Sequence, residues 1–148
     1  MNKDQIAQIR LFNRYYTSVI GLLDKHYLAS DFSLTETRIM FELYHEPEGL
    51  SPSDLIELLN LDKGYLSRIL KMFEKKKLVE KLRSENDGRS FRLKLTQLGT
   101  GIFSKLNTAA EDLTAQMLTP LSDEETAALV THMNAIREIL NKSAKKDI

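Results

Sequence analysis

Residues 51–76 read SPSDLIELLNLDKGYLSRILKMFEKK, a pattern that predicts two helices joined by a short turn. Ser51, the proline after it and an acid in the first turn form a strong helix start, because the hydroxyl caps free N–H groups and proline suits the first helical position. A short turn follows, and Asp62 caps a second helix over about residues 63–76. Helices joined by so short a turn must cross steeply, which predicts a helix-turn-helix.

The second of these helices has two distinct faces. Its apolar residues recur every three or four positions and predict a buried stripe of Leu66, Ile69, Leu70 and Phe73. The opposite face is polar and basic, and such a face can enter a DNA major groove and reach base edges. We therefore expect DNA contacts from Lys63, Gly64, Tyr65, Ser67, Arg68 and Lys71. The alternative is an ordinary solvated helix surface.

Within this face the residues have different expected roles. Arg68 is expected to read a base or a phosphate, with Tyr65 and Ser67 as nearby hydrogen-bonding contacts. Gly64 has no side chain, so it lets the backbone come close to the sugar-phosphate wall.

Alternating apolar and polar residues predict two half-buried strands, at about residues 78–83 and 90–95. The Asp-Gly pair between them is typical of a hairpin turn. Arg89 at the tip is expected to probe a minor groove, and Asp87 is expected to orient a wing arginine. Phosphate contacts that set the register are expected from Arg83, Arg92 and Lys94.

Amphipathic helices are predicted on both sides of this module. One spans about Asp4 to Leu28, and a shorter one, capped by Ser33 or Thr35, runs to about His45. Two more are expected at residues 97–118 and 123–142, with Ser122 capping the last. The predicted fold is therefore mainly α with a small β-hairpin wing, an α+β winged helix-turn-helix with six helices. It forms a single domain over residues 1–148, with the DNA-binding part at 33–96 and dimerisation helices at 1–30 and 97–145.

A net positive charge is concentrated in the middle of the chain. The whole sequence has a net charge of zero, but residues 60–96 contain eleven basic and five acidic residues, a net of +6. The remaining residues therefore carry −6. Such segregation is expected of a localised phosphate-binding face.

Composition excludes several other classes of protein. There is no cysteine, which rules out disulfides and thiol-based redox sensing in this chain. The three histidines, His26, His45 and His132, lack metal-ligand spacing, so no metal site is expected. We also expect no cofactor and no enzymatic activity, because no paired acids, nucleophile motif or phosphate-cradling glycine loop is present. No apolar run of about 20 residues and no secretory signal is visible, so a cytoplasmic location without membrane contact is expected.

Three sequence blocks, in this order and spacing, resemble the MarR family over nearly the whole chain. They are residues 62–74, DKGYLSRILKMFE, followed by Leu78-Val79; then the DGR of the hairpin; then residues 95–99, LTQLG. The opening IRLFNRYY and the SLTETR at residues 33–38 are similar to a subgroup in which the module often precedes a GNAT-type acetyltransferase domain. The chain resembles the regulatory part of such a protein standing alone.

The resemblance implies a bacterial transcriptional regulator, a repressor that acts as a homodimer on a pseudo-palindromic operator in double-stranded DNA. It also implies a small aromatic effector between the dimerisation helices and the winged helix. The residues that could line its pocket are Phe12, Tyr15, Tyr16, His26 and Phe32. Core packing is an equally good explanation for these aromatic side chains.

Two departures from the family pattern stand out. Lys77 occupies the position after the recognition helix where glycine is usual and where a left-handed backbone is often needed. Gly64 and Tyr65 stand where many members carry small hydroxyl residues, so no base preference transfers. The alternative function is a regulatory or protein-docking module that works with a GNAT-type acetyltransferase. The residues of the +6 segment argue against it, since a docking module need not keep a phosphate-binding face.

Overall fold

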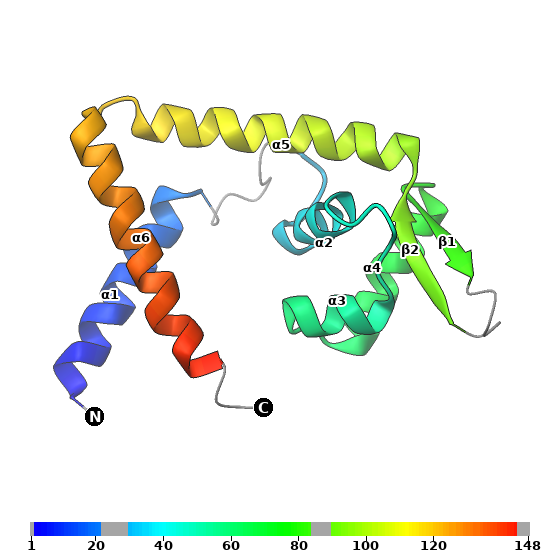
Figure 1. Cartoon of the computed structure of the whole chain (residues 1–148), viewed down its shortest axis with the longest axis horizontal. Coiled ribbons are helices and arrows are strands. Elements are labelled where there is room, and N and C mark those ends of the chain that lie inside the picture. Colours follow the sequence, from blue (N-terminus) through cyan, green and yellow to red (C-terminus); the bar gives the residue numbers. More distant parts are fainter. Residues whose placement is uncertain (1, 22–29, 84–89, 145–148) are drawn as a thin grey trace. The chain divides into compact units, whose positions relative to one another are not determined.

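The computed structural model describes residues 2–21, 30–83 and 90–144, and the chain divides into two compact units, Met1–Ala110 and Glu111–Ile148. Within the described residues, six helices and a two-stranded antiparallel hairpin confirm the predicted mainly helical fold with a wing. Figure 1 labels them in chain order: α1 (Lys3–Val19), α2 (Leu34–Tyr44), α3 (Pro52–Leu59), α4 (Lys63–Lys75), β1 (Val79–Arg83), β2 (Phe91–Leu95), α5 (Gln97–Leu118) and α6 (Asp123–Ala144).

Capping side chains explain where α2 and α3 begin. Ser33 caps α2 and forms a reciprocal capping box with Glu36, as predicted. Ser51 does the same for α3: its hydroxyl accepts from the Asp54 N–H at 3.1 Å, and the Asp54 carboxylate accepts from the Ser51 N–H at 2.9 Å. Each box satisfies two backbone donors that the first helical turn leaves without a partner, so these positions are fixed starting points.

The first helix is shorter than predicted. α1 ends at Val19, whereas the apolar spacing predicted a helix to about Leu28, so that boundary was wrong. Gly21 has a φ of +74°, which is incompatible with a continuing right-handed helix. Residues 22–28 of the predicted helix lie outside the described part of the chain.

The wing contains one contact more than the predicted hairpin. β1 and β2 pair from Val79↔Leu95 to Arg83↔Phe91, within one residue of the predicted strand starts. In addition Leu50, just before α3, forms an antiparallel bridge with Leu93, with N···O distances of 3.0 and 2.7 Å. This bridge fixes the base of the wing to the helix-turn-helix. The predicted turn at residues 84–89 lies outside the described residues.

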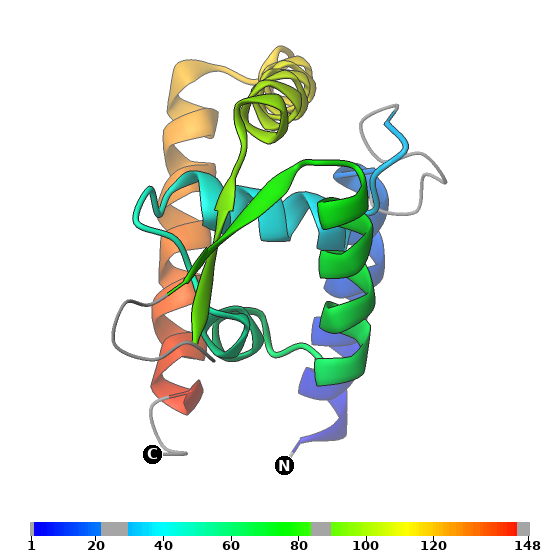
Figure 2. The same cartoon turned by 90° about the vertical axis from the view of Figure 1, so that its right-hand side faces the viewer.

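One core holds the winged helix together. It combines the α4 stripe predicted from the sequence with side chains from α2, α3, the wing and the start of α5. Its members are Ile39, Met40, Leu43, Leu50, Leu55, Leu66, Ile69, Leu70, Phe73, Leu78, Val79, Leu93, Leu95, Phe103 and Leu106. Figure 2 shows α3 nearly end-on and α4 from its side, so the two helices cross steeply, as a helix-turn-helix requires.

The second unit contains the end of α5 and all of α6. A capping box of Ser122 and Glu125 starts α6 as predicted, and the helix ends at Ala144 instead of Lys142. Its surface exposes large apolar side chains, among them Val130, Ile136 and Ile139. In the described part of the chain, no helix is both long enough and apolar enough to cross a membrane.

Candidate nucleic-acid interface

The start of α4 is rigidly defined by its flanking residues. Asn60 ends α3 in a left-handed conformation, with φ 50° and ψ 51°, which turns the chain within two residues. Asp62 then caps α4, and its carboxylate accepts from the Tyr65 N–H at 2.9 Å. Because this cap holds the first turn, the side chains of that turn have a defined direction.

The two faces of α4 divide as the sequence predicted. Leu66, Ile69, Leu70 and Phe73 are buried in the core. The side chains predicted to contact DNA are all exposed: Lys63, Tyr65, Ser67, Arg68 and Lys71, with Gly64 exposed beside them. The structure thus brings these six residues together on one accessible surface, which we call the α4 outer face.

The cations of this face form no ion pair with the acids that the structure describes. Among the described residues, Lys63, Arg68 and Lys71 have no carboxylate within 4.0 Å, whereas Arg38 and Lys81 do. Cations without such partners can bind phosphate or base edges without first breaking an ion pair. The α4 outer face therefore has the electrostatics of an anion-binding surface.

Arg68 lies back along the first turn of α4. Its guanidinium carbon is 6.0 Å from the ring centroid of Tyr65. One terminal nitrogen is 3.8 Å from the point where a Cβ on Gly64 would lie. Residues three and four apart on a helix are surface neighbours, so the guanidinium rests beside the ring and in the space that glycine leaves.

Lys77 follows the C-cap residue of α4, in place of the usual glycine. This lysine has φ +60°, so it adopts the left-handed conformation that the family usually gives to glycine. Its N–H donates to the Glu74 carbonyl at 3.0 Å, and the Leu78 N–H donates to the Phe73 carbonyl at 2.9 Å, which together form a Schellman motif. The departure at this position therefore leaves the geometry of the helix end intact.

The segment after the wing packs directly on this helix end. The Thr96 hydroxyl donates to the Lys77 carbonyl at 2.6 Å and accepts from the Gly99 N–H at 3.1 Å. A Cβ on Gly99 would overlap the Leu78 carbonyl oxygen, so only glycine allows this approach. The Leu-Thr-x-x-Gly motif thus joins α4, the wing and α5.

Sequence reasoning missed the contacts that hold the wing against α4. The Lys81 ammonium lies 3.6 Å from the Glu74 carboxylate and 4.5 Å from the Phe91 ring centroid. No periodic pattern marks such a contact, because it joins one helix residue to two strands. On the other side, Arg92 donates to the Gly49 carbonyl at 3.4 Å. The pKa of Asp54 is lowered first by hydrogen bonds from Ser51 and to a smaller extent by the charge of Arg92.

Three of the predicted wing contacts can be placed and two cannot. Arg83 and Arg92 lie on exposed positions at the outer ends of the paired strands, Arg83 closing β1 and Arg92 in β2. Lys94 is exposed on β2 as well. Asp87 and Arg89 lie outside the described residues, so their predicted roles remain predictions.

A groove of about 430 Å³ connects the α4 outer face with α3 and the wing. Apolar side chains of Ile56, Leu66 and Leu70 line it together with the polar Lys63, Ser67 and Lys71. Ser53 at the start of α3 and Lys81 on the wing also line it. The groove therefore joins apolar side chains of the core to polar side chains of the α4 outer face, and the acidic Glu74 also lines it.

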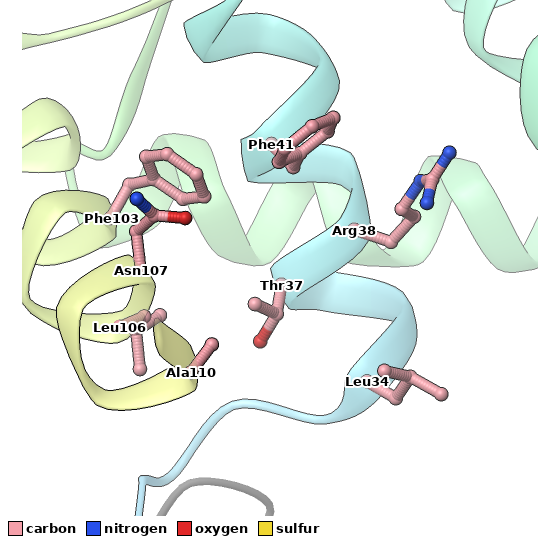
Figure 3. Close-up of a pocket in the computed structure, with 8 residues that line it drawn as sticks. All are labelled: Leu34, Thr37, Arg38, Phe41, Phe103, Leu106, Asn107 and Ala110. Atoms are coloured by element: carbon pink, nitrogen blue, oxygen red, sulfur yellow. The ribbon is translucent and has the colours of Figure 1, made fainter. Parts of the chain in front are cut away.

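A second pocket lies between α2 and the first half of α5, with a volume of about 250 Å³. Figure 3 shows Phe103, Asn107 and Ala110 of α5 on one side, and Thr37 and Phe41 of α2 on the other. Leu34, Arg38 and Leu106 complete its lining.

Four of the five residues predicted to line an effector pocket lie elsewhere. Phe12 and Tyr16 stack on each other along α1, with ring centroids 5.5 Å apart, and Tyr15 is exposed. Phe32 packs edge-on against Phe73 of the core. None of these four lines the α2–α5 pocket, and His26 lies outside the described residues.

Comparisons of the sequence with known proteins found one family and its relatives. The model of the MarR family matches residues 30–90. The HTH-type transcriptional regulator SarZ of Staphylococcus aureus is 30% identical over 136 residues, which cover 89% of this chain and 90% of SarZ.

Two solved structures share the fold. A mutant of MarR from E. coli, complexed with operator DNA, superposes with a TM-score of 0.70 at 24% identity and covers 90% of this chain and 95% of that one. A complex of S. aureus MepR with DNA gives a TM-score of 0.69 at 19% identity, with coverages of 87% and 95%. The match to the family model and the extent of the SarZ match show that the chain belongs to the MarR family of HTH-type transcriptional regulators.

Proposed function

We propose that this protein is a sequence-specific, double-stranded DNA-binding repressor that acts as a homodimer in the cytoplasm, without catalytic activity. The observation that carries the proposal is the α4 outer face, an exposed helix surface whose cations lack carboxylate partners among the described residues. The ion pair of Lys81 in the wing with Glu74 and the cap at Asp62 support this helix. A helix presented in this way fits the major groove, about 12 Å wide.

The wing extends the contact to the neighbouring groove. Arg83, Arg92 and Lys94 are suited to bind phosphates, because phosphate contacts fix position without reading sequence. Arg89 is proposed to enter the minor groove, with Asp87 orienting a wing arginine. The fold is shared with the MarR and MepR structures solved with DNA, which supports this arrangement.

Dimerisation through residues 1–30 and 97–145 completes the proposal, with the DNA-binding part at 33–96 in a single domain over residues 1–148. The exposed apolar residues of α6 support it, since large apolar side chains on a long helix favour burial against a partner. A twofold dimer would place two copies of α4 about 34 Å apart, one turn of DNA, and would select an inverted repeat.

The experiment starts with selection of random-sequence DNA by the purified protein, followed by binding titrations on the recovered site. Arg68→Ala is expected to cost about 1–3 kcal/mol of binding free energy, and Arg89→Ala to weaken binding as well. Arg38→Ala is the matched control, because this exposed arginine of α2 is paired with Glu42 at 3.0 Å. Lys71→Ala is expected to weaken binding to all DNA sequences alike. It should also reduce the slope of the logarithm of the binding constant against the logarithm of the salt concentration by about one.

The alternative function has a distinct outcome in the same experiment. A module that docks a GNAT-type acetyltransferase would enrich no sequence even at low salt, while the protein remained folded. Its affinity for the acetyltransferase would also not fall steeply as the salt concentration rises, since it would make no phosphate contacts.

An effector is proposed to bind the α2–α5 pocket rather than the aromatic residues predicted from the sequence. The pocket has aromatic walls, Phe41 and Phe103, and polar groups from Thr37 and Asn107, which suits a small aromatic compound. Titration with phenol and benzoate should show binding that Ala110→Leu abolishes, because the longer side chain fills the space seen in Figure 3. Equal binding to both proteins would contradict this site.

A further inference from the structure

We propose that each half-site of the operator contains a guanine flanked by a thymine, read together by Arg68 and Tyr65. The inference rests on the proposed function and specifies which bases the α4 outer face selects. Its physical basis is the contact between the guanidinium of Arg68 and the ring of Tyr65, at 6.0 Å.

Arg68 is arranged to present its donors as a fork. Its guanidinium lies beside the Tyr65 ring, and one terminal nitrogen is 3.8 Å from the position of a Cβ on Gly64, to which an Asp62 carboxylate oxygen is nearer, at 3.2 Å. Among the described residues, no carboxylate lies within 4.0 Å of the guanidinium. A guanidinium that is held but not paired matches guanine, whose N7 and O6 both accept in the major groove.

Tyr65 is arranged to present an apolar surface at the same place. Its backbone N–H is fixed by the Asp62 carboxylate at 2.9 Å, and its side chain is 38% exposed although it stands beside buried Leu66. An aromatic face in the major groove contacts the thymine methyl group favourably, because thymine alone among the four bases offers an apolar group there.

The distance between the two side chains determines the spacing of the two bases. Successive bases along a strand lie about 3.4 Å apart. Two side chains that lie side by side on one helix turn can therefore reach the same or neighbouring base pairs. We therefore place the guanine and the thymine next to each other in the half-site.

The test uses base analogues in the operator recovered by selection, with affinity measured by fluorescence anisotropy. Replacing the guanine by 7-deazaguanine removes one acceptor, and wild type should lose about 5-fold or more in affinity. Replacing the thymine by deoxyuridine removes only the methyl group, and wild type should lose about 4-fold. The same replacements outside the half-sites serve as the DNA control.

Variants assign each effect to its residue. Arg68→Ala should become insensitive to 7-deazaguanine, and Tyr65→Ala should become insensitive to deoxyuridine. Tyr65→Phe keeps the ring and should behave as wild type. Circular dichroism checks that each variant is folded, which is expected because both side chains are exposed.

Three outcomes would overturn the inference while leaving the proposed function intact. The first is that the recovered half-sites lack a guanine beside a thymine. The second is that deoxyuridine lowers the affinity of wild type and of Tyr65→Ala equally, and the third is that Tyr65→Phe loses as much affinity as Tyr65→Ala, which would make the hydroxyl the contact. Failure of wild type to enrich any sequence at low salt would instead overturn both.

Discussion

Lys77 adopts a backbone conformation that costs L-amino acids about 1 kcal/mol, and it does so where glycine would have no such cost. Lys77→Gly should therefore raise the free energy of unfolding by about 0.5–1 kcal/mol, measured by urea denaturation. Lys76→Gly is the control, because Lys76 has φ −82° and ψ 0° and gains nothing from glycine. Equal effects of the two substitutions would contradict the assignment of strain to Lys77.

Gly99 and Gly101 form a matched pair on the same turn of α5. A Cβ on Gly99 would overlap the Leu78 carbonyl oxygen, whereas a Cβ on Gly101 meets nothing within 4 Å. Gly99→Ala should lower the free energy of unfolding by at least about 1–3 kcal/mol, because the helix must move away from the wing. Gly101→Ala should be stabilising by up to about 1 kcal/mol, since alanine favours the helix. Thermal unfolding of the two variants measures both, and destabilisation of the same size would count against the close contact.

The start of α3 gives a prediction at the scale of an element, because its capping box titrates. The N–H and hydroxyl of Ser51 hold the pKa of the Asp54 carboxyl below its usual value of 3.8, with help from the charge of Arg92. A carboxyl with a lowered pKa in the folded protein stabilises it above the unfolded pKa, and the contribution is lost as the pH falls through the folded value. Asp54→Asn should thus be less stable than wild type at neutral pH, and the difference should shrink below about pH 4.

The outcome is read from unfolding free energies between pH 7 and pH 2. Ser51→Ala, which removes the other half of the box, should cost about 1 kcal/mol at pH 7. A difference between Asp54→Asn and wild type that stays constant down to pH 2 would show that the charge of Asp54 has no part in the stability of α3.

Helix starts were predictable from the sequence because caps are local signals. Ser33, Ser51, Asp62 and Ser122 each act on donors within three residues, so the pattern alone identifies them. The end of α1 was not predictable, because apolar residues continue at helical spacing beyond Gly21 and a single glycine is a weak break. The bridge between Leu50 and Leu93 joins residues far apart in the chain and leaves no periodic trace.

Part of the candidate site was also predictable from the sequence, and part was not. The exposed face of α4 follows from helical spacing, so its six residues were predicted as a group. The contact of Arg68 with Tyr65, the ion pair of Glu74 with Lys81 and the α2–α5 pocket depend on tertiary packing and side-chain direction. Composition and spacing carry no information on these.

At the scale of the whole molecule, the apolar surface of α6 predicts that two copies associate. Ile136 and Ile139 are 43% and 64% exposed and lie three residues apart, so they share one side of the helix. Ile139→Asp should convert the dimer to a monomer in sedimentation equilibrium, because a carboxylate is costly to bury at an apolar contact. Asn134→Asp is the control: it adds the same charge on a different side of the same helix and should leave the dimer intact. Because operator binding by a dimer needs both copies of α4, Ile139→Asp should also lose most of its operator affinity at concentrations where wild type binds. A monomeric wild type, or an Ile139→Asp variant that stays dimeric, would show that this face of α6 does not join the subunits.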